Sequence, residues 1–189
     1  MKRGIYIISV CFMLMFVFSG CGKKNQMSED IQFTLKEICS TQFTDEPYIY
    51  SYEITNSDIR GLIKNEAINE LFLSQVQYKI ESLSKESDNT HGEAIISFSF
   101  PDLMAVIEES AASLDSDSGT EALFSIVSKK LQGNCKKKKE KISVDMIYIH
   151  SHWYIIPNAD FSNVLSGGML EYYSLLGNEY VKNKTQEEP

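Results

Sequence analysis

The feature that most constrains the fold is an alternating run of apolar residues near the C-terminal end of the chain. In the segment 142–149 most apolar side chains recur at every second position, and a second run, 152–156, follows after a two-residue gap and is closed by Pro157. A period of two places these side chains on one face of a strand. The two runs predict a β-hairpin at the centre of a sheet, with Trp153 on its inner face.

Other periodic segments complete the predicted fold. Alternation predicts antiparallel strands at 75–81 and 94–100 and a short strand at 48–54, whereas spacings of three and four predict helices. The helices are expected at 28–39, 59–72, 103–107, 121–131 and 158–176, the last with a bend at Gly167–Gly168. This order predicts a single α+β domain over residues 29–181, a curved antiparallel sheet packed against helices, followed by a polar tail over 182–189.

The chain opens with a charged and then apolar segment. Lys2 and Arg3 precede an apolar run from Ile5 to Phe18, which is shorter than the about 20 residues needed to span a bilayer. This pattern is typical of a signal peptide over residues 1–20, and the alternative is an uncleaved anchor. Either interpretation places the domain outside the cytoplasmic membrane.

The residues Val17-Phe18-Ser19-Gly20-Cys21 resemble the lipobox of bacterial lipoproteins, in which the cysteine thiol receives diacylglycerol and becomes the first residue. Phe18 departs from the family pattern, which usually has Leu there. The resemblance implies that Cys21 is lipidated and that the protein is held on the extracytoplasmic face of the cell membrane. Residues 21–28 are then expected to be the lipidated cysteine and a polar tether, whose Lys23 and Lys24 either contact anionic headgroups or stay solvated.

Short motifs in the second half of the chain carry another resemblance. The motifs are Phe98-Ser99-Phe100-Pro101-Asp102-Leu103, Trp153-Tyr154-Ile155-Ile156, Asn158-Ala159-Asp160-Phe161 and Leu165-Ser166-Gly167-Gly168. With them the chain resembles small Gram-positive lipoproteins that have an NTF2-like or cystatin-like domain. NTF2-like folds host isomerases, dehydratases, transport factors and binding modules. The resemblance therefore implies a fold and leaves the function open.

No group of residues forms a catalytic motif. His150 and His152 share a face if their strand is regular, but His91 belongs to a distant loop, so we expect no metal site and no cofactor. Asp145 beside Tyr148 is the one candidate acid–base pair. The alternation places Asp145 on the solvent face, so we expect no catalytic residue.

Two cysteines remain once the signal peptide takes Cys11 and the lipid takes Cys21. Cys39 and Cys135 form a candidate disulfide in an oxidising exterior, where a bridge across so long a loop contributes roughly 2 to 4 kcal/mol. The alternative, to which we give equal weight, is that both cysteines are free, buried thiols. Their spacing does not fit a thiol oxidoreductase.

The charge balance narrows the class of partner. The chain has a net charge of −8, and removal of Lys2 and Arg3 with the signal peptide makes the remainder more acidic. A nucleic-acid partner is disfavoured because binding it requires a basic face on the protein. The lysine run 136–141 is expected to be a solvated strand end, and contact with anionic lipid or wall polymer is the alternative.

These observations lead to a functional expectation. We expect a membrane-anchored extracytoplasmic lipoprotein that acts as a non-catalytic binding or accessory module, with an envelope protein or a small apolar ligand as partner. The ligand would bind in a hydrophobic cup between sheet and helices. The alternatives are an NTF2-like enzyme of the isomerase or hydrolase type and an envelope scaffolding or immunity-type protein.

Overall fold

A four-stranded antiparallel sheet organises the fold in the computed structural model, which describes residues 22–40, 46–50, 63, 65–115 and 119–170. The strands are hydrogen-bonded in chain order: β1 (Gln77–Lys85), β2 (His91–Pro101), β3 (Lys137–Ile149) and β4 (His152–Ile156). The two predicted antiparallel pairs are confirmed, and so is the α+β class.

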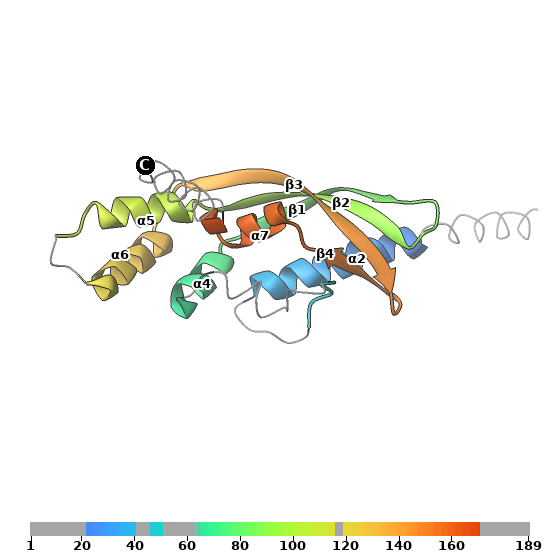
Figure 1. The fold of residues 1–189 in the computed structure, drawn as a ribbon, viewed down its shortest axis with the longest axis horizontal. Coiled ribbons are helices and arrows are strands. Elements are labelled where there is room, and N and C mark those ends of the chain that lie inside the picture. The colour runs from blue at the N-terminus through green and yellow to red at the C-terminus, as the bar shows by residue number, and fades with distance from the viewer. Residues whose placement is uncertain (1–21, 41–45, 51–62, 64, 116–118, 171–189) are drawn as a thin grey trace, which may run out of the picture.

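Five helices accompany the sheet within the described residues. They are α2 (Gly22–Cys39), α4 (Glu66–Leu73), α5 (Leu103–Ala111), α6 (Thr120–Gln132) and α7 (Ala159–Leu165). Figure 1 shows α2, α4 and α7 on one side of the sheet, whereas α5 and α6 extend from one end of the molecule. The pair α5 and α6 is an insertion between the two long central strands, β2 and β3.

The inner face of the sheet is apolar because its strands alternate in burial. Every second residue is buried on β2 and, on β3, from Ile142 to Met146. Ala94 pairs with Val144 and Ile96 pairs with Ile142. The buried inner residues of the two strands are Ala94, Ile96, Phe98, Phe100, Ile142, Val144 and Met146. This row of side chains is the surface on which the helices pack.

Helix α2 covers the β4 and β1 parts of this face. Met27, Ile31, Leu35 and Ile38 recur at helical spacing and are at most 1% exposed. The helix begins at Gly22, where we expected a polar tether over 21–28 and a helix only from Ser28. Met27 adds one turn to the apolar stripe.

The start of β2 makes room for this extra turn of α2. A β-carbon added to Gly92 would lie 2.9 Å from the methyl carbon of Met27, so the missing side chain is what lets the methionine reach the sheet. Cys21 and the predicted signal peptide lie outside the described residues.

The remaining predictions differ from the structure mostly at their ends. Ile49 forms a single parallel bridge with Ile155 in place of a regular strand, and residues 51–62 lie outside the described part. Helix α4 begins at Glu66, where the Asn65 side chain accepts a hydrogen bond from the Ile68 amide. The predicted C-terminal part of the last helix and the polar tail 182–189 are also outside the described residues.

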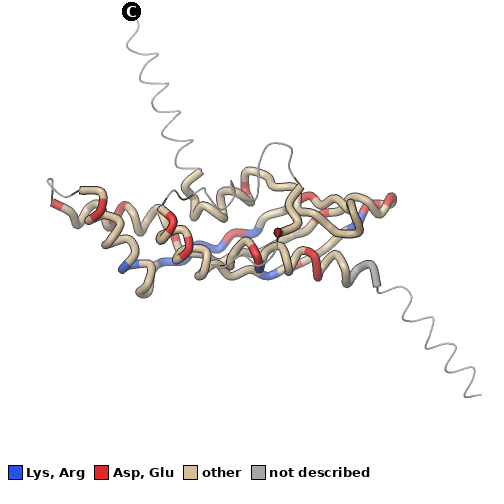
Figure 2. The backbone as a smooth tube through the Cα atoms, turned by 90° about the horizontal axis from the view of Figure 1, so that it is seen from below, with Lys and Arg blue, Asp and Glu red and all other residues tan. Residues whose placement is uncertain are grey.

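Lysines mark the beginning of β3. Figure 2 shows basic positions gathered in a run, and the sequence places them at 136–139 and 141. Strand β4 pairs with β3 only from Asp145 onward, so within the described residues the first half of β3 has no strand on that side. Lysines at such an edge oppose pairing with another chain, in line with the predicted solvated strand end.

Gly167 permits the bend after α7 and should not tolerate a side chain. Its φ of +65° is left-handed, and a β-carbon there would lie 2.7 Å from the Leu103 β-carbon and 2.9 Å from the Phe72 ring. Backbone strain and overpacking together should make Gly167→Ala lower the free energy of unfolding by about 2–4 kcal/mol. Urea denaturation measures this change.

Gly119 offers the matched control. It is the N-cap of α6, and nothing lies within 4 Å of an added β-carbon. Because serine is a favoured N-cap, Gly119→Ser should change stability by less than about 0.5 kcal/mol, in the stabilising direction. Equal effects of the two substitutions would contradict the role assigned to Gly167.

Candidate functional site

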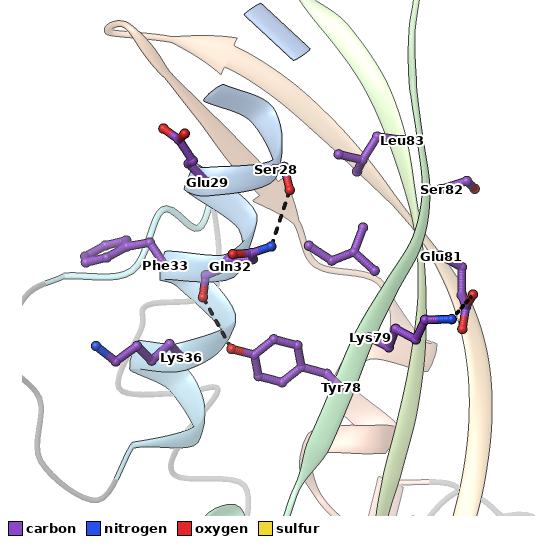
Figure 3. A pocket seen from close by; sticks show the side chains of 11 residues that line it. Ser28, Glu29, Gln32, Phe33, Lys36, Tyr78, Lys79, Glu81, Ser82 and Leu83 are labelled. Carbon is purple, nitrogen blue, oxygen red and sulfur yellow. Dashed lines mark hydrogen bonds and ion pairs between the residues drawn. The ribbon is translucent and has the colours of Figure 1, made fainter. Parts of the chain in front are cut away.

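A groove of about 1070 Å³ lies between α2 and β1 (Figure 3). The α2 wall consists of Ser28, Glu29, Gln32, Phe33 and Lys36, and the β1 side consists of the residues from Tyr78 to Leu83. The groove exists because α2 packs mainly on β4, so β1 extends beyond the helix at the edge of the sheet.

The floor of the groove is apolar and its rim is polar. Tyr78, Ile80 and Leu83 are half-buried and pack against the core, whereas Lys79 and Glu81 are exposed and form a 2.9 Å ion pair. Hydrogen bonds from Lys79 and Ser97 hold the pKa of Glu81 below its ordinary value. The Glu81 carboxylate therefore stays ionised at neutral pH.

Tyr78 links the two walls. Its hydroxyl donates a weak 3.4 Å hydrogen bond to the Gln32 carbonyl, and partial burial, followed by the nearby Cys39, raises its pKa. The phenol is therefore neutral near pH 7 and can donate or accept a hydrogen bond. None of the residues that line the groove is a histidine or a cysteine.

Strand β1 is the edge of the sheet, but its edge is interrupted. The register with β2 shifts between Ile80 and Ser82, so Glu81 bulges out of the ladder, and Lys79 lies beside it. Bulges and edge lysines both oppose the addition of another strand. A ligand in the groove would thus be held by side chains rather than by a continued β-ladder.

A second polar group ties α2 to the hairpin of β3 and β4. Asp30 is only 7% exposed, and one of its oxygens accepts a 2.9 Å hydrogen bond from the Trp153 amide. Its other oxygen lies 3.1 Å from Nδ1 of His152, within hydrogen-bond distance. The Tyr48 ring stacks on His152 with ring centroids 4.3 Å apart. The group acts as a clamp between helix and strand.

Sequence reasoning missed this role of Asp30. A helix over 28–39, as predicted, would place Asp30 in an acidic first turn, whereas the helix begins a turn and a half earlier. The available signal was its spacing: Asp30 follows Met27 by three residues and precedes Thr34 by four, so it belongs to the buried stripe of the helix.

The histidines considered as metal ligands lie in different surroundings. His152 binds Asp30, His91 lies 3.0 Å from Asp88, and His150 is exposed at the tip of the β3–β4 turn with a φ of 49°. Asp145 is exposed, as its place in the alternation predicted, and it pairs with Ile156 in the ladder. Tyr148 packs on Trp153, so the candidate acid–base pair with Asp145 is not assembled.

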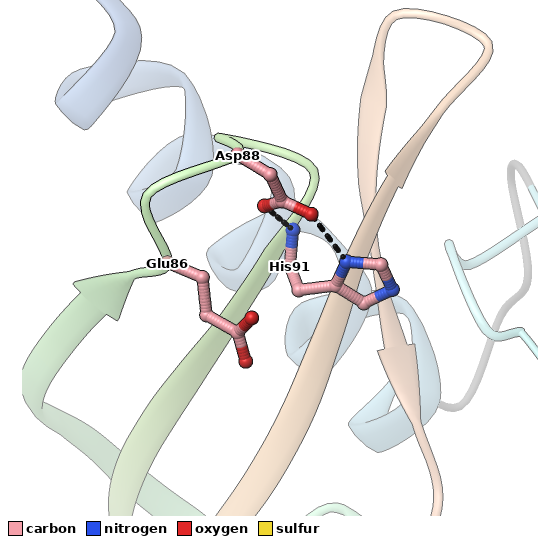
Figure 4. A group of neighbouring side chains, drawn as sticks. All are labelled: Glu86, Asp88 and His91. Atoms are coloured by element: carbon pink, nitrogen blue, oxygen red, sulfur yellow. Dashed lines mark hydrogen bonds and ion pairs between the residues drawn. The ribbon is translucent and has the colours of Figure 1, made fainter.

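The structure instead brings Glu86, Asp88 and His91 together in the β1–β2 turn (Figure 4). One potential ligand atom from each lies within 4.8 Å of the others, and all three residues are exposed. Asp88 accepts hydrogen bonds from the hydroxyl and amide of Thr90 and from His91, and these bonds lower its pKa well below the ordinary value. The carboxylate is already engaged in shaping the turn.

The cysteines lie in different surroundings. Cys39 ends α2 near Tyr78, and Cys135 lies between α6 and β3. Both are partly buried against the core, and no disulfide joins them in this structure. Cys21 is not among the described residues.

Comparisons of the chain with protein-family models, with curated proteins and with solved structures found no match. Within the described residues, no helix is both long and apolar enough to cross a membrane.

The clamp at Asp30 can be tested by truncation. Asp30→Ala would leave the buried Trp153 amide without its acceptor and should lower the free energy of unfolding by about 2–3 kcal/mol. Its neighbour Glu29 is exposed, so Glu29→Ala should change stability by less than about 0.5 kcal/mol. Urea unfolding followed by the fluorescence of Trp153, the single tryptophan, measures both. A stability loss in Asp30→Ala no larger than in Glu29→Ala would refute the clamp.

Proposed function

We propose that this chain is a lipid-anchored extracytoplasmic binding module whose groove between α2 and β1 takes an amphipathic ligand. The groove is the observation that carries the proposal, because it combines a size sufficient for a small molecule with an apolar floor and a polar rim. The proposed fold is the NTF2-like or cystatin-like one, supported by an antiparallel sheet packed on a helix.

The ligand chemistry follows from the two sides of the groove. An aromatic or aliphatic surface would lie against Tyr78, Ile80 and Leu83, which are only half-buried. Polar groups on the ligand would face Gln32 and Lys36 on α2. A small amphipathic molecule fits this pattern better than an extended peptide, because the bulge at Glu81 interrupts strand addition.

The anchoring part of the proposal rests on the N-terminal sequence. The signal peptide over residues 1–20 and the lipobox-like motif that ends at Cys21 support lipidation of that cysteine. The membrane is then a partner through the lipid, and the domain works on the extracytoplasmic face. Helix α2 begins at the next residue, so the domain would follow the lipid directly.

The enzyme alternative ranks below binding. The part-buried Asp30–His152 contact is the arrangement closest to a catalytic pair, but neither residue lines the groove and both Asp30 oxygens are engaged by β4. The scaffolding or immunity-type alternative predicts a protein as the occupant of the groove. A photo-crosslinking residue at Lys36 in intact membranes would give protein adducts in that case and none with a small ligand.

Binding in the groove can be measured with the fluorescent probe 8-anilinonaphthalene-1-sulfonate, which is itself amphipathic. Ile80→Gln removes an apolar group from the floor and should weaken probe binding about five- to tenfold, the effect of losing one buried aliphatic contact. Ile95→Gln is the control, since Ile95 pairs with Ser82 on the neighbouring strand and does not line the groove. Equal probe affinity in the two variants would refute binding in the groove.

Lipidation is tested separately by labelling cells with palmitate. The native protein should incorporate the label and sediment with membranes, and Cys21→Ala should lose the label because the acceptor thiol is gone. Label that persists in Cys21→Ala would refute the lipobox assignment.

A further inference from the structure

We infer that the β1–β2 and β3–β4 turns form a surface that rests against lipid headgroups, so that the α5–α6 pair points away from the bilayer. This inference rests on the lipidation of Cys21 proposed above and adds the orientation in which the lipid holds the domain.

The path from the lipid to the β3–β4 turn is short. Cys21 is covalently joined to Gly22, the first residue of α2. A helix rises 1.5 Å per residue, so Gln26 lies about 6 Å further along the axis. The Gln26 side chain donates a hydrogen bond to the Ser151 carbonyl in the β3–β4 turn. The distance from Cys21 to the β3–β4 turn is therefore no more than about the length of two turns of an α-helix.

The β1–β2 turn is packed at the same place. Lys85 and Asn89 line a small cleft together with Gln26 and Trp153, and the Tyr148 amide donates a 2.7 Å hydrogen bond to the Thr90 carbonyl. Figure 1 shows the beginning of α2 and both turns at one end of the molecule, with α5 and α6 at the opposite end.

The connection is stiff as well as short. A flexible tether would let the domain take any orientation, but α2 is helical from Gly22 and is fixed to the sheet by Met27, which is 0% exposed. The Asp30 clamp lies one turn further on. The lipid thus holds a helix whose direction relative to the sheet is set by packing.

The chemistry of the two turns opposes insertion deeper than the headgroup layer. Glu86, Asp88, His150 and Ser151 are exposed and polar, and carboxylates are costly in hydrocarbon. The exposed large apolar residues in the described part of the chain are Phe124 on α6 and Leu170 after α7. The turns should therefore contact the headgroup layer without entering the acyl chains.

Labels on single cysteines test the orientation in the full, acylated protein. In a Cys39→Ser, Cys135→Ser background, fluorophores are placed at Ser87→Cys in the β1–β2 turn, Ser151→Cys in the β3–β4 turn and Ser125→Cys on α6. All three serines are exposed. The protein is reconstituted in vesicles of phosphatidylcholine and phosphatidylglycerol that carry a headgroup nitroxide. Labels at Ser87 and Ser151 should be quenched by the nitroxide several-fold more than the label at Ser125, and aqueous iodide should show the reverse order.

The controls separate orientation from anchoring. Failure of the acylated protein to float with the vesicles would overturn the lipid anchor and the orientation together. Flotation with equal nitroxide quenching at Ser87, Ser151 and Ser125 would overturn the orientation alone. A flexible Gly-Ser insertion between Cys21 and Gly22 should keep flotation and remove the difference between the labels, and a difference that persists would show that the stiffness of α2 is not its cause.

Discussion

The packing of α2 across the sheet is the interaction on which the other features depend. Four apolar side chains from one face of this helix are at most 1% exposed, and burial of each contributes up to about 1.5–3 kcal/mol. The Asp30 carboxylate then fixes the position of the helix along β4, because it accepts a hydrogen bond from the Trp153 amide. The groove and the stiff link to Cys21 are both consequences of this one contact.

The sheet could be predicted from the sequence because its signal is local. Residues such as Ile96, Phe98 and Val144 alternate with exposed or half-buried neighbours, and a period of two is visible within each strand without knowledge of its partner. The start of α2 and the hydrogen-bond partner of Asp30 could not be predicted in the same way. The polar segment before Met27 has no apolar period, and the partner of Asp30 is 123 residues away in the chain.

The open groove does not lie where the sequence predicted a binding site. A hydrophobic cup between sheet and helices was expected, but that space is filled by Phe72, Phe98, Phe100 and Phe161, which pack edge to face in two pairs. The open groove lies instead at the margin, where β1 extends past α2. Whether large side chains fill an interior depends on how elements from distant parts of the chain meet, and periodicity does not report this.

The early start of α2 also determines the direction in which the chain before the helix leaves the domain. Successive residues of an α-helix are turned by about 100° around its axis. Each residue inserted or deleted between Gly22 and Gln26 would therefore swing whatever precedes the helix by about that angle, while Met27 keeps its place on the sheet. The number of residues in this first turn is thus a structural parameter, and it sets the side of the domain from which the preceding chain leaves.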